Sequence, residues 1–163
     1  MEQMSMFTPL SKYLIDSSSI FAQKPTDTLP RVVHRSLWEA IEKSIRERKI
    51  VTCSEIEEEV KNDDIVGNWL QVNQCVIIPI DDEVQKNVRR IVTEHPRMID
   101  FSGGQGSSSG DAFLIATAMK YKNLTIITEE NPKKQNKIPS ICNGYGIHTV
   151  SITELCVVEG WSF

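Results

Sequence analysis

The sequence predicts an α/β fold, a three-layer α/β/α sandwich with a mainly parallel central sheet. Short apolar runs alternate with helical patterns along the whole chain, and this alternation is typical of a parallel sheet covered by helices. The chain has 163 residues, of which 40% are hydrophobic and 25% charged. That length allows one compact domain with a substantial core, so we expect residues 1–163 to form a single domain.

The strands are predicted from short apolar or β-branched runs that polar residues bound. The first run ends at Ile15 and is followed by one acid, Asp16, and three serines. The other strands are expected in IVTC (50–53), CVIIPI (75–80), LTIIT (124–128) and the first part of IHTVSITELCVVEG (147–160).

The helices are predicted from apolar residues at helical spacing and from capping patterns. The segment 31–49 carries one apolar stripe, formed by Val33, Leu37, Ile41 and Ile45. Ser54 and Glu57 form a capping-box pattern for a helix over 54–61. Further helical segments are expected at 17–23, 67–73, 81–95, 111–122 and 138–146 and at the chain end, with a flexible Gly/Ser loop at 102–110.

Charge and cysteine content narrow the function classes. The net charge of −4 argues against holding nucleic acid by bulk electrostatics, but it permits a local basic groove and fits an acidic metal site. The four cysteines are far apart and lack a CxxC pattern, which indicates reduced thiols in a cytoplasmic protein. No apolar run approaches the roughly 20 residues of a membrane span, and the N-terminus does not resemble a signal peptide.

Acidic residues follow the predicted strands or begin the helices after them. In parallel sheets, sites form beyond the carboxyl ends of the strands, so these acids are expected to meet. Clustered carboxylates repel one another unless a divalent cation neutralises them, and Mg²⁺ or Mn²⁺ suits oxygen ligands. Such a site can hydrolyse a phosphodiester. The candidates are Asp16, Glu55, Glu57, Glu58, Glu59, Asp111, Glu129 and Glu130.

Each acid also has a simpler interpretation. Asp16 and Asp111 could cap the helices that begin beside them. The glutamates of 55–59 could form a solvated helix face, and Glu129 and Glu130 could be ordinary loop acids. The ordered set is more informative than any member, because one fold would bring the whole set to one edge of the sheet.

Two stretches carry a resemblance to a known family. YLIDSSSIF and GDAFLIATAMKYKNLTIITEE resemble the two signatures of PIN-domain nucleases, which VapC-type toxins of bacterial toxin–antitoxin pairs also carry. The tail TEENPKKQNKIPSICNGYGIHTVSITEL resembles a PIN-like bacterial family of unknown function, through Thr-Glu-Glu, Lys-Ile-Pro, a following Cys and Gly-Ile before the last strand. The resemblance runs from about Tyr13 to Phe163.

The resemblance implies a PIN fold and RNA cleavage that depends on Mg²⁺ or Mn²⁺. Asp16 matches the family's first acid and Asp111 the third. Glu59, directly before Val60, matches the second, with Glu55 as its competitor. Glu130 matches the fourth acid, with Glu129 next. Ser18 occupies a position that could orient Asp16 or a bound water, and Thr128 matches the usual hydroxyl before the fourth acid. Serine at 18 replaces the usual asparagine, and glutamate replaces the usual aspartate at the fourth position.

The leading hypothesis is therefore a metal-dependent endoribonuclease, the toxin of a toxin–antitoxin pair. Lys133, Lys134 and Lys137 are expected to contact phosphates of single-stranded or looped RNA. The family resemblance further implies a homodimer and a cognate antitoxin. The alternatives are a non-toxin PIN nuclease of RNA processing and a catalytically weak PIN-fold binding module. A Rossmann-like nucleotide binder is disfavoured, because GGQGSSSG lacks GxGxxG after a strand and has no Walker lysine.

Overall fold

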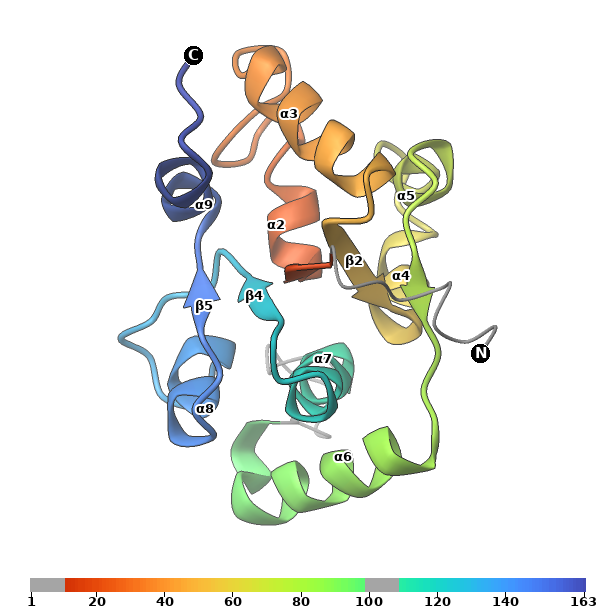
Figure 1. Ribbon diagram of the computed structural model, residues 1–163, viewed down its shortest axis with the longest axis vertical. Coiled ribbons are helices and arrows are strands. Elements are labelled where there is room, and N and C mark those ends of the chain that lie inside the picture. Colours follow the sequence, from red (N-terminus) through yellow and green to blue (C-terminus); the bar gives the residue numbers. More distant parts are fainter. Residues whose placement is uncertain (1–10, 99–108) are drawn as a thin grey trace.

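A central parallel sheet organises the chain in the computed structural model, which describes residues 11–98 and 109–163 (Figure 1). The described residues contain five strands in the order β3-β2-β1-β4-β5. Every neighbouring pair is parallel, as the sequence predicts. The strands are β1 (Tyr13–Ile15), β2 (Ile50–Cys53), β3 (Ile77–Ile78), β4 (Thr125–Ile127) and β5 (Thr149–Val150).

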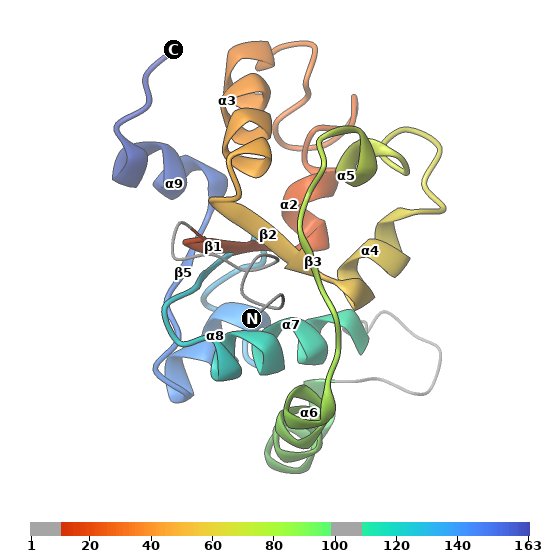
Figure 2. The same cartoon turned by 45° about the vertical axis from the view of Figure 1, so that its right-hand side comes forward.

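Helices cover both faces of the sheet, which confirms the three-layer α/β/α sandwich. Figure 2 shows α2 (Ser17–Phe21), α3 (Arg35–Arg46), α5 (Trp69–Val72) and α9 (Ile152–Glu159) on one side. On the other side lie α6 (Asp82–Glu94), α7 (Ser109–Lys120) and α8 (Ile138–Gly144). Helix α4 (Ser54–Val60) packs against α7 and α2, and a short 3₁₀ turn, η1 (Pro96–Met98), follows α6.

The strands and α7 form the centre of the core. Strands β1, β2 and most of β4 are buried, as continuous apolar runs in a covered parallel sheet should be. Helix α7 is apolar on several sides because it lies between the sheet and α6. Its alanines allow close packing, and they are buried together with Leu114 and Ile115: Ala112, Ala116 and Ala118.

Helix α3 differs from its predicted extent at the N-terminal end. Leu37, Ile41 and Ile45 are buried as predicted, but Val33 lies before the helix and is 71% exposed. The amides of Val33 and His34 both donate to Pro30 O, at 3.0 and 2.9 Å, so the chain turns there before the helix begins. Trp38 takes the remaining core position of the stripe and is fully buried.

Three local predictions need correction. Ser54 and Glu57 do not form a capping box, because Cys53 is the N-cap and Ser54 is already helical. Strand β3 covers Ile77–Ile78, less than the predicted 75–80. In the predicted loop at 102–110, residues 102–108 lie outside the described residues, and Ser109 and Gly110 belong to α7.

The structure also shows the state of the cysteines and the character of the helices. Cys53, Cys75, Cys142 and Cys156 all lie within the described ranges and are free thiols. Among the helices of the described ranges, none is long and apolar enough to cross a membrane.

Candidate metal centre

The sheet order places two loop segments side by side at the carboxyl edge of the strands. Strand β1 lies between β2 and β4, so the chain leaves β1 and β4 at the point where the strand order changes direction. Parallel α/β sheets form their ligand sites at this point. Asp16 follows β1 directly, and its amide donates to Ile127 O at 2.9 Å, which joins the two strand ends.

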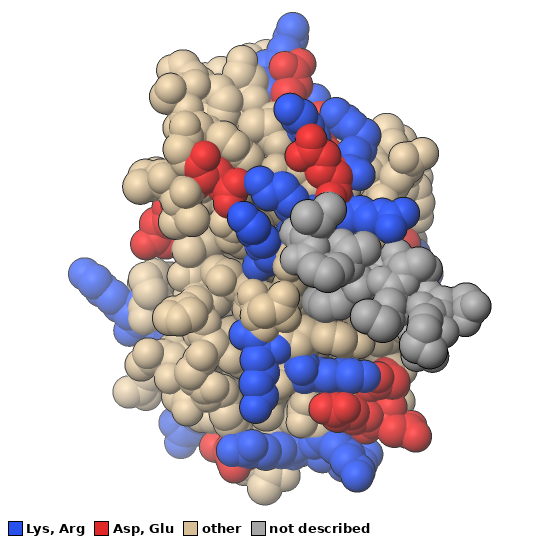
Figure 3. Space-filling view, in the orientation of Figure 1, with Lys and Arg blue, Asp and Glu red and all other residues tan. Residues whose placement is uncertain are grey.

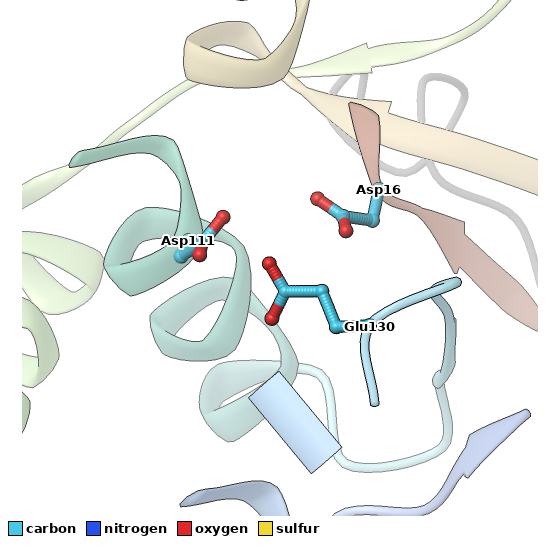
Figure 4. Close-up of side chains that lie close together, drawn as sticks. All are labelled: Asp16, Asp111 and Glu130. Carbon is cyan, nitrogen blue, oxygen red and sulfur yellow. The ribbon is translucent and has the colours of Figure 1, made fainter. Parts of the chain in front are cut away.

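Three carboxyl groups meet at this edge. Asp16, Asp111 and Glu130 each offer an oxygen atom, and these atoms lie within 4.8 Å of one another. Figure 4 shows the three groups pointing toward one another from β1, α7 and the segment after β4. Asp16 and Asp111 are almost fully buried, at 1% and 3% exposure, and Glu130 is partly buried. The cluster therefore concentrates acidic charge in a site that water barely reaches.

Hydrogen bonds fix the carboxylate of Asp16. The amide of Ser17 donates to Oδ1 at 2.8 Å, so Asp16 is also the N-cap of α2. The hydroxyls of Ser18 and Thr128 donate to Oδ2, at 2.6 and 2.8 Å. Both hydroxyls also accept a backbone N–H: Ser18 Oγ from Glu129 at 3.0 Å, and Thr128 Oγ1 from Glu130 at 3.2 Å. This network ties the strand end of β1 to the segment that carries Glu130.

Burial and mutual repulsion disfavour ionisation of the clustered acids. Burial raises the pKa of Asp16 from 3.8 to about 6, against the opposing hydrogen bond from Ser18. Burial raises the pKa of Asp111 to about 9, and the charges of Asp16 and Glu130 add to the increase. These shifts mean that the folded protein holds negative charge here at a cost that a bound cation would remove.

Glu59 adds a fourth carboxyl group from α4. Its charge contributes to the raised pKa values of Asp16 and Asp111, and its carboxyl group lies against Gly110, the residue before Asp111. The Oε1 atom of Glu59 is buried and has no hydrogen-bond partner in the described part of the chain. A buried carboxylate oxygen without a donor is unusual, and a bound cation would give it a partner.

The competing glutamates lie elsewhere. Glu129 turns away from the cluster, and its Oε2 accepts the amide of Ile152 in the first turn of α9 at 2.8 Å. Glu55 lines a separate groove with Phe113 and Arg89. Glu130 Oε1 accepts the amide of Ile138, the first residue of α8, at 2.8 Å. Of the alternatives left open by the sequence, Glu130 lies with Asp16 and Asp111. Glu59 is not one of these three, but its carboxyl group lies against Gly110, the residue before Asp111.

The donor set fits a hard divalent cation. All four groups offer carboxylate oxygens, the ligands that Mg²⁺ and Mn²⁺ prefer. The buried, unpartnered Oε1 of Glu59 is the observation that favours a cation over a purely structural acid cluster. A groove of about 790 Å³ lies at a different place: Arg31, Glu42 and Trp69 are among the residues that line it.

Two neighbours of the cluster could not be assigned from the sequence. Gly110 lies directly against the carboxyl group of Glu59, and no spacing rule signals that contact. Cys142 of α8 is buried; burial raises the pKa of its thiol, and the charges of Asp16 and Glu130 raise it further. Cys142 is the cysteine that follows Lys-Ile-Pro in the tail motif. It lies on α8, the helix whose first amide donates to Glu130.

The three candidate RNA-binding lysines lie on one segment. Lys133 and Lys134 are exposed in the connection between β4 and α8, and Lys137 is the partly exposed N-cap of α8. The segment begins directly after Glu130, one of the clustered acids. Elsewhere, the face seen in Figure 3 carries Lys and Arg interspersed with Asp and Glu.

Comparison with known proteins places the chain in a family. Residues 13–163 match a family described as a domain of unknown function, DUF4411. The chain belongs to this family. No curated protein matches the DUF4411 chain.

Solved structures share the fold of the DUF4411 chain at low sequence identity. PAE2754 from Pyrobaculum aerophilum is 15% identical, with a TM-score of 0.53 over 92% of this chain and 96% of that one. FitAB bound to a DNA fragment, IR36, gives 16% identity and a TM-score of 0.53 over 86% and 94%. FitAcB from Neisseria gonorrhoeae is 17% identical, with a TM-score of 0.52 over 86% of this chain and 98% of that one. These likenesses support a PIN-like fold.

Proposed function

We propose that this DUF4411 chain is a divalent-metal-dependent endoribonuclease, a phosphodiester hydrolase of the PIN-domain type. One observation carries the proposal: Asp16, Asp111 and Glu130 place carboxylate oxygens within 4.8 Å of one another at the switch point of the sheet. Two of these acids are almost fully buried and the third is partly buried, so their mutual repulsion disfavours the arrangement unless a positive charge is present. A site for a cation that binds phosphate gives the arrangement a purpose.

Asp16, Asp111, Glu130 and Glu59 would hold the cation, Mg²⁺ or Mn²⁺. A bound cation of this type lowers the pKa of water and neutralises the charge that develops on the phosphate during hydrolysis. The protein supplies the geometry: Ser18 and Thr128 keep Asp16 in one orientation through their hydrogen bonds to Oδ2. The amide of Ile138 holds Glu130 in the same way.

The substrate is proposed to be single-stranded or looped RNA. The net charge of −4 leaves little general attraction for a polyanion, so binding depends on local contacts. Lys133, Lys134 and Lys137 follow Glu130 along the chain and are exposed or partly exposed, and we propose that they contact backbone phosphates near the cleaved bond. Unpaired bases can be splayed out and read individually, which favours loops and single strands over duplex RNA.

Cleavage of a mixed RNA pool tests the proposal. The wild-type protein should cut RNA with Mg²⁺ or Mn²⁺ and not with EDTA. Asp16→Asn and Asp111→Asn should each reduce the rate by roughly 100-fold or more, because even partners of metal ligands contribute 10–100-fold. Glu58→Gln is the matched control, since Glu58 lies on α4 beside Glu59 but is exposed and pairs with Lys61.

Two results would reject the ribonuclease. Cleavage that survives in both aspartate variants would come from a contaminant or from another site. Absence of cleavage together with absence of Mn²⁺ binding by calorimetry would remove the metal centre and favour a PIN-fold binding module.

We further propose that the enzyme is the toxin of a toxin–antitoxin pair, acting as a homodimer in the cytoplasm and inhibited by a small antitoxin. The fold shared with FitAB and FitAcB supports this reading. Expression of the wild-type protein in a bacterial host should arrest growth, and Asp16→Asn should not. Normal growth with an active enzyme would favour the alternative, a PIN nuclease of RNA processing.

A further inference from the structure

Gly110 is the second residue of the helix α7 and directly precedes Asp111. Glycine weakens a helix relative to alanine, so a helical glycine needs a reason. A positive φ is not the reason, because the described glycines with a positive φ are Gly146 and Gly160 and not Gly110. The position is buried, which leaves space as the explanation.

The space around Gly110 is filled by the carboxyl group of Glu59. A Cβ atom at position 110 would lie 2.4 Å from Oε1, 2.7 Å from Cδ and 3.1 Å from Oε2 of Glu59. Two of these distances are shorter than any ordinary contact. The carboxyl group of Glu59 therefore occupies the volume that a side chain at position 110 would need, and it would have to move if one were introduced.

The position of the Glu59 carboxyl group matters because it is oriented without help from hydrogen bonds at Oε1. That atom is buried and accepts none within the described residues. Asp16 and Asp111 are held in place by α2, α7 and the strand ends, whereas Glu59 reaches the site on a longer side chain from α4. Packing against the bare Cα of Gly110 is thus a main constraint on where its oxygens lie.

We propose that Gly110 is a positioning residue of the cation site: its missing side chain lets the Glu59 carboxylate lie beside Asp111 and join the acids that bind the cation. This inference rests on the cation site proposed above. It explains why a helix that is otherwise rich in alanine has glycine at this one position of its first turn.

Mn²⁺ binding to four variants tests the assignment. The variants are Gly110→Ala, Glu59→Ala, the double variant, and Gly144→Ala as the matched control. Gly144 also lies in a helix, and a Cβ there would meet nothing within 4 Å. Calorimetry should show Mn²⁺ binding weakened by roughly 10–100-fold in Gly110→Ala and unchanged in Gly144→Ala. The double variant should bind Mn²⁺ as Glu59→Ala does.

Thermal unfolding of the metal-free variants gives a second readout. With Glu59→Ala in place the volume is free, so Gly110→Ala should raise the Tm by roughly 2–4 °C through helix propensity. With Glu59 present, the same substitution should give no such increase. This non-additivity reports the contact itself and does not depend on metal or on RNA.

The outcomes separate this inference from the proposed activity. The role of Gly110 would be overturned if Gly110→Ala bound Mn²⁺ with wild-type affinity. It would also be overturned if Gly110→Ala weakened Mn²⁺ binding equally with Glu59 present and with Glu59→Ala. RNA cleavage would stand in either case. Mn²⁺ binding that depends on Gly110 in a protein that cuts no RNA would reject the ribonuclease and support the assignment. A wild-type protein that binds no Mn²⁺ would overturn the cation site and this role with it.

Discussion

The side chain of Thr128 joins two of the clustered acids. Its hydroxyl donates to Asp16 Oδ2 at 2.8 Å and accepts the amide of Glu130 at 3.2 Å. One hydroxyl therefore sets the orientation of an acid from β1 and the backbone position of an acid beyond β4. Groups that orient metal ligands in this way usually affect affinity nearly as much as weaker ligands do.

Thr128→Val should weaken Mn²⁺ binding by roughly 10–100-fold, because it removes both hydrogen bonds and keeps the shape of the side chain. Calorimetric titration with Mn²⁺ measures the effect. Thr52→Val is the matched control: its buried hydroxyl donates to Ile15 O at 2.7 Å and does not touch the acids. Equal affinities in the two variants would show that Thr128 serves only stability.

The sequence could not tell which of two nearby glutamates lies at the cluster, and the local geometry explains why. Glu129 and Glu130 are adjacent in a loop, and one turns to the amide of Ile152 while the other turns to the cluster. Loop conformation decides this, and no periodic pattern encodes it. Glu55 and Glu59 are one turn apart on α4, and both lie near α7: Glu55 lines a groove with Phe113, whereas the carboxyl group of Glu59 lies against Gly110.

At the scale of elements, the carboxylate of Glu159 links α9 to the sheet. Glu159 Oε2 accepts from the hydroxyl of Tyr13 at 2.6 Å, and its Oε1 pairs with Lys49 at 2.7 Å. Tyr13 belongs to β1 and is 5% exposed, so the bond links the last helix to the central strand.

Tyr13→Phe should lower the free energy of unfolding by about 1 kcal/mol, because a hydrogen bond is lost and an acceptor is left with fewer donors. Urea denaturation measures the change. Tyr145→Phe is the control, since its hydroxyl bonds the exposed Glu94 and water can replace that bond. A larger effect at Tyr145 than at Tyr13 would contradict this account of how α9 is held.

Elements with strong periodic or continuous apolar patterns were predictable, and elements set by local competition were not. Strands β1, β2 and β4 follow from short buried apolar runs. The capping box was expected at Ser54, but Ser151 and Glu154 form one instead, at the start of α9. Both pairs have the required spacing, so the residue at which the helix begins after the strand decides which pair forms a capping box.

At the scale of the whole molecule, the buried acids make stability depend on pH. The pKa values of Asp16 and Asp111 are raised in the folded protein to about 6 and about 9. The folded state therefore binds more protons than the unfolded state between about pH 4 and pH 9, and the free energy of unfolding decreases as pH rises through that range.

The metal-free protein should lose on the order of 5 kcal/mol of stability between pH 5 and pH 8 from these groups, as measured by urea denaturation. Asp111→Asn should flatten the dependence, because its side chain does not titrate. Saturating Mn²⁺ should oppose the loss at pH 8, since it binds the ionised form. Metal-free stability that rises from pH 5 to pH 8 would contradict the buried, repelling cluster.

The segment from 131 to 137 is closed into a loop by the hydrogen bond from Ile138 N to Glu130 Oε1. Its two ends are thus held together at the acid cluster, and its three lysines project from a short, tethered arc. A loop whose two ends are held together loses less conformational entropy than an open chain when it binds a polyanion. Pre-organisation of this kind would let so few positive charges be effective in a protein of negative net charge.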